Sequence, residues 1–179
     1  MPYSSLDYVT ESTKPLKSEA PSMFMDIWSK HRSLGSNRGE LSLDKAVKFF
    51  NKISPLGLTV YVHESFQDEI FGPKVKYISD MPRMQFYEFI KSVWFYATSI
   101  MSSYEFIILE ATMNGALCVN IDHSVNIEHL KSSSVISDLD FSENYLSLID
   151  QFNPIKNSES ARLIYNNSLY EDILGKMLA

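Results

Sequence analysis

The sequence predicts an α/β fold: a Rossmann-like, open and mostly parallel sheet with helices on both faces. Short segments rich in β-branched and aromatic residues alternate along the chain with stretches whose apolar residues recur every three or four positions. Residues 96–120 show the alternation most compactly, as an apolar strand, a polar turn, an apolar helix, a glycine and a second apolar strand. Such alternation is typical of a parallel sheet covered by helices.

Composition sets the size and the class of the protein. With 179 residues, 45% hydrophobic and 21% charged, the chain can bury one ordinary core, so we expect a single domain. The apolar stretches are far shorter than the ~20 residues of a membrane span, and the first residues lack the apolar core of a signal peptide. The only cysteine, Cys118, cannot form an internal disulfide and is expected in a buried strand rather than as a nucleophile. We therefore expect a cytoplasmic protein.

The charge balance bears on partners. A net charge of -6 argues against a large nucleic-acid footprint, although a local basic patch stays compatible with it. Residues 1–22 are rich in Ser, Thr and Pro and are expected to form a polar tail or an interdomain linker, with the domain proper at 23–179.

The first half of the domain follows from local patterns. Residues 23–28 predict the first strand, and Ser42 is a good N-cap for a helix that Pro55 and Gly57 end. The helix carries an apolar stripe at Leu43, Ala46, Val47 and Phe50. Strands are then predicted at 58–62 and 75–78 around a Gly-Pro turn, followed by a helix after Pro82 and a strand at 93–96.

The second half continues in the same way. An apolar helix ends at Gly115, and residues 117–121 predict a buried strand. A short helix is expected at 125–130, and Ser142 is expected to cap another. C-terminal helices are predicted at 159–165 and 170–177. The clustered aromatic residues are interpreted as core, with an interaction face as the alternative; they are Phe86, Tyr87, Phe89, Trp94, Phe95 and Tyr96.

Ligands of open parallel sheets bind beyond the carboxyl ends of the strands, so two strand-to-helix turns are the candidate contacts. The turn at 30–39 contains two glycines and four basic residues, which can hold a phosphate or can simply be solvated. The second turn, 98–105, leads to Glu110, an acid flanked by Ile107, Ile108, Leu109 and Ala111. Burying such a carboxylate costs several kcal/mol unless hydrogen bonds compensate. Glu110 therefore binds a ligand, caps backbone amides or reaches solvent.

The block from Ser102 to Val119 resembles a known motif, because a serine-rich turn precedes "LEATMNGALCV" as it precedes "LEAMxxGxPVV" in the E-x7-E region of retaining GT-B glycosyltransferases of the family 4 type. The order of elements over about residues 23–175 is similar to the C-terminal half of these enzymes. The resemblance implies a domain that binds the nucleotide half of a nucleotide-diphosphate sugar. It departs from the family at Ser102, where the first acid of the motif is expected.

The resemblance implies roles for particular residues. Glu110 matches the acid that hydrogen-bonds ribose hydroxyls, and Arg32 and Arg38 correspond to the basic residues that grip the diphosphate. The full set of donor-binding candidates is Arg32, Arg38, Ser102, Ser103, Tyr104, Glu105 and Glu110. No catalytic residue is assigned, and the scheme requires neither a metal ion nor a cofactor. His123 and His129 do not have the spacing of a zinc site.

A complete GT-B enzyme has two such domains, whereas 179 residues hold one. The resemblance therefore implies the donor-binding half of a glycosyltransferase, which needs an acceptor-binding domain or partner chain for activity. The alternative is a non-enzymatic module of the same fold that binds a nucleotide or a protein partner. Loss of the first motif acid and of the second domain favours this alternative.

Overall fold

The computed structural model of the chain describes residues 17–27, 38–67, 71, 75–98, 106–121 and 135–164. The strands are β1 Ser22–Asp26, β2 Thr59–His63, β3 Val75–Ile78, β4 Phe95–Thr98, β5 Leu117–Asn120 and β6 Val135–Ser137. The α-helices are α2 Arg38–Ile53, α3 Arg83–Ser92, α4 Phe106–Met113, α5 Asp138–Asp150 and α6 Pro154–Ile164. Two single 3₁₀ turns, η1 Ser54–Leu56 and η2 Glu64–Phe66, flank β2.

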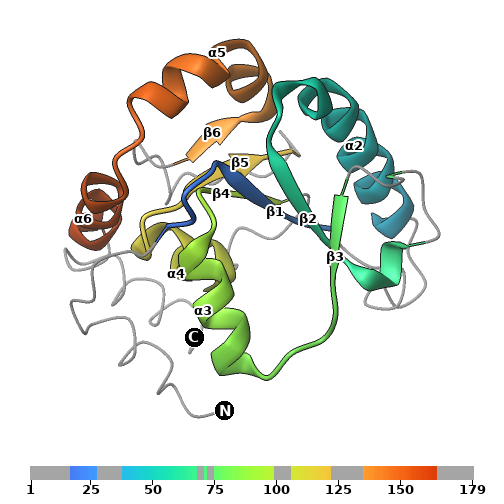
Figure 1. Ribbon diagram of the computed structural model, residues 1–179, viewed down its shortest axis with the longest axis horizontal. Coiled ribbons are helices and arrows are strands. Elements are labelled where there is room, and N and C mark those ends of the chain that lie inside the picture. The colour runs from blue at the N-terminus through green and yellow to red at the C-terminus, as the bar shows by residue number, and fades with distance from the viewer. Residues whose placement is uncertain are drawn as a thin grey trace, which may run out of the picture.

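The six strands form one sheet in the order β3-β2-β1-β4-β5-β6, and every neighbouring pair is parallel. Helices α2 and α5 cover one face of this sheet and α3 and α4 the other (Figure 1). The Rossmann-like α/β prediction is therefore confirmed, as a single domain.

The alternation of side chains along each central strand builds the two layers of core. Met25 of β1 and Phe95 of β4 belong to the cluster beneath α2 and α5, while Phe24 and Tyr96 belong to the cluster beneath α3 and α4. Successive strand residues point to opposite faces, so a parallel strand buried on both sides is apolar throughout. This explains why β1 and β4 read as continuous apolar runs.

The aromatic cluster is core, as predicted. Phe95 and Tyr96 are completely buried, and Phe24 packs edge-on against Phe86 and Phe89 at 5.7 and 5.5 Å between ring centroids.

Among the described residues, no helix is both long and apolar enough to cross a membrane.

Several predicted boundaries are wrong, and each has a local cause. Helix α2 begins at Arg38, so Ser42 lies inside it rather than at its cap. Likewise, Ser142 lies inside α5, whose N-cap is Ser137, because the Ser137 hydroxyl accepts from the Asp140 amide at 3.0 Å. In both cases an earlier residue starts the helix, and a serine within the first turns resembles a cap in sequence.

Other elements differ at their ends. Strand β4 begins at Phe95, two residues later than predicted, and α6 begins at Pro154, earlier than predicted. Strand β6 was not predicted, because its three residues are too short for a pattern. The stop after α2 is confirmed, with Gly57 at φ 73°. The Gly-Pro turn and the helices predicted at 125–130 and 170–177 lie outside the described residues.

Candidate functional site

The candidate site lies where the strand order reverses. From β1 the chain moves outward through β2 to β3, and from β4 it moves outward the other way through β5 to β6. Asp26, the last residue of β1, is in register with Thr98, the last residue of β4. Open parallel sheets bind ligands in the crevice outside the carboxyl ends of the strands at such a reversal.

Both turns predicted from the sequence start at this point. The segment between β1 and α2 contains Arg32 and ends at Arg38, and the segment between β4 and α4 contains residues 102–105. Because β1 and β4 are neighbours, the topology brings the starts of these two turns together. The sequence predicted the two turns, and the strand order adds that they leave adjacent strands.

The predicted donor-binding side chains are outside what the structure describes. Arg32, Ser102, Ser103, Tyr104 and Glu105 lie outside the described residues. The remaining two candidates are placed only by their helices: Arg38 is the first residue of α2, and Glu110 is the fifth residue of α4. Their proposed contacts stay predictions.

Helix α4 is fixed against the rest of the domain by its buried residues. Ile108 and Ala111 belong to the core cluster beneath α3 and α4, and the Thr112 hydroxyl donates to the carbonyl oxygen of Ile108 at 3.0 Å. At 1.5 Å per residue, Glu110 is about 6 Å along the axis from the first residue of the helix. That distance is compatible with a ligand bound beyond the helix N-terminus, where backbone amides attract anions.

At the reversal itself, sequence reasoning missed a part-buried contact to an acid. The hydroxyl of Tyr96 donates to Oδ2 of Asp26 at 2.5 Å, and the Tyr96 ring is completely buried. Both residues belong to the strands that meet at the reversal. The available signal was an acid that ends an otherwise apolar strand, Met23-Phe24-Met25-Asp26.

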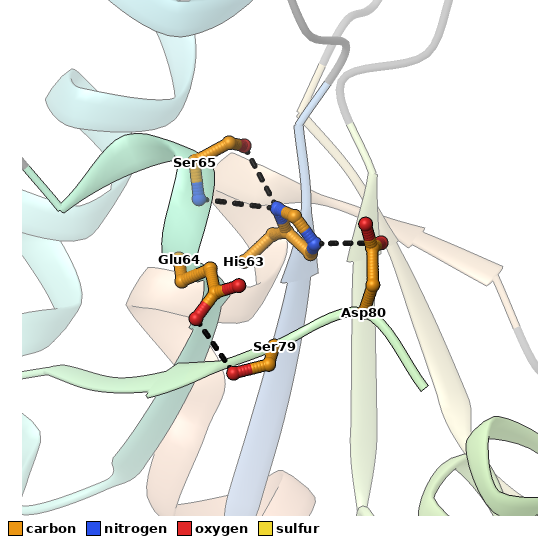
Figure 2. A network of polar contacts seen from close by, with 5 residues as sticks. All are labelled: His63, Glu64, Ser65, Ser79 and Asp80. Carbon is orange, nitrogen blue, oxygen red and sulfur yellow. Dashed lines mark hydrogen bonds and ion pairs between the residues drawn. The ribbon is translucent and has the colours of Figure 1, made fainter. Parts of the chain in front are cut away.

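A second group of polar side chains joins the ends of β2 and β3 (Figure 2). Nε2 of His63 lies 3.1 Å from Oδ1 of Asp80, and Nδ1 lies 2.8 Å from the Ser65 hydroxyl. Glu64 accepts a hydrogen bond from the Ser79 hydroxyl at 2.6 Å. Two polar contacts, one from His63 to Asp80 and one from Ser79 to Glu64, therefore join the chain after β3 to the chain after β2.

The order Ser65, His63, Asp80 resembles a nucleophilic triad, but the geometry gives it a structural role. The backbone N–H of Ser65 donates to Nδ1 of His63 at 3.1 Å, so that lone pair is already used to cap η2. A general base needs this lone pair to take the serine proton. The side chain of Asp80 is also 99% exposed, so the protein holds it only loosely.

In the described part of the chain, no three His, Cys, Asp or Glu side chains are grouped to hold a metal ion.

Cys118 lies in a strand, as predicted. It is 1% exposed in β5, and burial raises the pKa of its thiol well above the usual range. A protonated thiol is a poor nucleophile, so burial favours the expected strand role of Cys118 over a nucleophilic one. His123 and His129 are outside the described residues.

No family model and no curated protein matches this sequence. Solved structures do match. A Listeria monocytogenes protein with a proposed UDP-N-acetylglucosamine 2-epimerase activity aligns over 80% of this chain and 39% of its own, with a TM-score of 0.50 and 12% identity. S. aureus MnaA, solved with UDP, aligns over 79% of this chain and 40% of its own, with a TM-score of 0.51 and 13% identity.

The fold is that of one half of a GT-B-like protein. This chain spans about two-fifths of the length of both neighbours. The GT-B-like half expected from the sequence is therefore found, whereas the E-x7-E type of glycosyltransferase is not among these neighbours. At identities of 12 and 13%, the similarity describes the fold alone.

Proposed function

We propose that this chain binds the nucleoside diphosphate part of a nucleotide sugar and serves as the donor-binding domain of a glycosyltransferase. The observation that carries the proposal is the reversal of strand order between β1 and β4, from which both predicted ligand-binding turns start. One turn is basic and glycine-containing, and the other leads into α4, which carries Glu110.

Each proposed residue has a charge that suits the part of the nucleotide it binds. The basic groups Arg32 and Arg38 hold the diphosphate, since a guanidinium donates hydrogen bonds in pairs to phosphate oxygens. Amides at the start of α4 add partial positive charge. Glu110 accepts hydrogen bonds from the ribose hydroxyls, which compensates its loss of hydration.

The structural neighbours favour uridine as the first base to test. MnaA was solved with UDP, and the Listeria protein is named for an activity on UDP-N-acetylglucosamine. Both are consistent with a nucleotide sugar at this kind of domain. The Listeria protein is named for an epimerase activity rather than for glycosyl transfer, so the reaction class needs its own experiment.

In glycosyl transfer, negative charge develops on the departing diphosphate, and the arginines and helix amides offset it. The sugar passes to an acceptor held by a second domain or partner chain. This chain alone is expected to bind the donor with little turnover, and the scheme uses no metal ion.

Binding is tested by the thermal midpoint of the chain in the presence of UDP, GDP, ADP and their common sugar conjugates. A ligand at 100 times its Kd adds about 2.7 kcal/mol of stability. We expect UDP or its conjugates to raise the midpoint and Glu110→Gln to abolish the rise without unfolding the protein. Glu143→Gln, on the exposed side of α5, is the matched control and should keep the full rise.

Two results would count against the proposal. If no nucleotide shifts the wild-type midpoint, nucleotide binding by this chain is wrong. If Glu110→Gln keeps the shift, binding stands but the ribose role of Glu110 is wrong.

The reaction class is tested by adding a binding-competent UDP-sugar and following the products. Transfer releases UDP in proportion to glycosylated acceptor once a protein supplying the acceptor site is present. Epimerisation converts the sugar while it stays attached to UDP. Binding without either product under these conditions would instead support the non-enzymatic module.

A further inference from the structure

The sequence contains a single Asn-Gly pair, Asn114–Gly115, and it lies where α4 ends and the connection to β5 begins. Such a pair is chemically labile, because a glycine nitrogen reaches the preceding asparagine side chain without hindrance from a Cβ. The nitrogen bonds to Cγ of the asparagine, the Cγ–Nδ2 bond breaks, and ammonia leaves with the proton that the glycine nitrogen gives up. Water then adds across one of the two carbonyl–nitrogen bonds of the succinimide. Cleavage at Cγ leaves aspartate, and cleavage at the backbone carbonyl leaves isoaspartate.

The folded chain holds this pair in a turn that opposes the reaction. The Gly115 amide donates to the carbonyl oxygen of Thr112 at 2.9 Å, and the Ala116 amide donates to that of Ala111 at 3.0 Å. With Gly115 at φ 82°, these two bonds form a Schellman motif at the end of α4. The attacking nitrogen is therefore engaged, and Asn114 is only 6% exposed. Ring closure requires this turn to break.

Helix α6 holds the same turn from outside. The Ser158 hydroxyl donates to the carbonyl oxygen of Met113 at 2.6 Å, and Nδ2 of Asn157 donates to that of Gly115 at 3.3 Å. The backbone of α6 is also close, since a Cβ on Gly115 would lie 2.3 Å from the carbonyl oxygen of Pro154. The asparagine lies between the two carbonyl groups that α6 binds. We therefore expect that α6 has to move away before the turn can open.

The products of the reaction are unfavourable in the folded turn. Aspartate would place a carboxylate at the C-terminal end of α4, where the helix dipole is negative and residue 114 has little contact with water. Isoaspartate adds a methylene to the backbone and so displaces the two hydrogen bonds of the Schellman motif. A chain that is modified while α6 is away therefore docks α6 less favourably. Loss of ammonia makes the change irreversible.

We propose that Asn114–Gly115 is a deamidation site that docked α6 protects, and that opening of α6 leads to a permanent negative charge at residue 114. The residue types favour the reaction, so the protection comes from the contacts between α4 and α6. The inference is independent of the proposed nucleotide site.

The wild-type chain tests the protection without any substitution. The chain is kept at mildly alkaline pH in native buffer and, in parallel, in guanidinium chloride. Mass spectrometry of the peptide that contains Asn114 then follows its conversion to aspartate and isoaspartate. Because refolding is fast relative to ring closure, the rate follows the population of open chains. We expect the folded chain to react at least about a hundredfold more slowly than the unfolded chain. Equal rates would overturn the proposal.

The role of α6 is tested by Ser158→Ala, which removes the hydroxyl that donates to the carbonyl of Met113. We expect the folded variant to deamidate about tenfold faster than the wild type, because a buried hydrogen bond that holds α6 is lost. In guanidinium chloride the two chains should react at the same rate. Glu159→Gln, at the exposed neighbouring residue of α6, is the matched control and should keep the wild-type rate. An unchanged rate in folded Ser158→Ala would overturn the role of α6.

A second measurement keeps the wild-type chain, so it does not depend on how the variant folds. Guanidinium chloride is added below the unfolding midpoint, and hydrogen exchange of the α6 amides is measured beside the deamidation rate. The two should rise together, because one opening controls both. Deamidation that rises while the α6 amides stay protected would overturn the role of α6.

Discussion

The amino ends and the carboxyl ends of the parallel strands, called here the amino edge and the carboxyl edge of the sheet, are built in opposite ways. At the amino edge, tight contacts join segments far apart in the chain: Trp94 stacks on Phe152 at 4.5 Å between ring centroids, and the Ser158 hydroxyl donates to the carbonyl of Met113 at 2.6 Å. At the carboxyl edge, described polar side chains such as His63 and Asp80 contact one another close to water.

The difference separates stability from binding. Contacts at the amino edge tie distant segments together, whereas the carboxyl edge keeps polar groups accessible at the ends of parallel strands. We therefore expect substitutions at the amino edge to act mainly on the free energy of unfolding. Substitutions at the exposed carboxyl edge should leave that free energy almost unchanged.

The largest effect is expected from Gly115→Ala at the amino edge. A Cβ at Gly115 would lie 2.3 Å from the carbonyl oxygen of Pro154, and the residue has φ 82°. Overpacking and a left-handed conformation together should cost about 3 kcal/mol or more in urea unfolding. Gly57→Ala is the matched control, because Gly57 has φ 73° but nothing within 4 Å, so it should cost about 1 kcal/mol. Equal losses in the two variants would show that the contact with α6 is not rigid.

An intermediate effect is expected from Tyr96→Phe at the strand reversal. The change removes the hydroxyl that donates to Asp26 while keeping the buried ring. Loss of a part-buried hydrogen bond to an acid should cost about 1–3 kcal/mol. Tyr61→Phe is the control, since Tyr61 makes no hydrogen bond through its hydroxyl among the described residues, and it should be neutral. A neutral Tyr96→Phe would make the contact to Asp26 dispensable.

The smallest effect is expected from Asp80→Asn at the exposed end of the network. The pair with His63 has one fully accessible partner, so its loss should cost less than about 1 kcal/mol. Added salt should reduce even this difference. Asp44→Asn, which breaks an exposed pair with Lys48 on α2, gives the comparison. A loss several times larger than that of Asp44→Asn would mean that the network supports the β3 end of the sheet.

Local pattern was sufficient to predict most of the fold. The stops at Gly57 and Gly115 and the buried strands around Phe95 and Cys118 follow from residue type and spacing. Helix starts were harder, because Ser42 and Ser142 have the chemistry of a cap while the chain becomes helical earlier. At the candidate site, the ligand roles of the two turns and of Glu110 stay predictions, and the bond between Tyr96 and Asp26, whose partners are 70 positions apart, was not predicted.

The sequence by itself determined the fold class and the order of the elements up to β5, because hydrophobic period and breaking residues act over a few positions. The tertiary structure decided the strand order β3-β2-β1-β4-β5-β6, which makes β1 and β4 neighbours. It also decided the contact of Lys17 with Val93 and the close approach of Gly115 to Pro154. These depend on which distant segments pack together, and that choice satisfies burial and hydrogen bonding over the whole domain, which no pattern within one segment encodes.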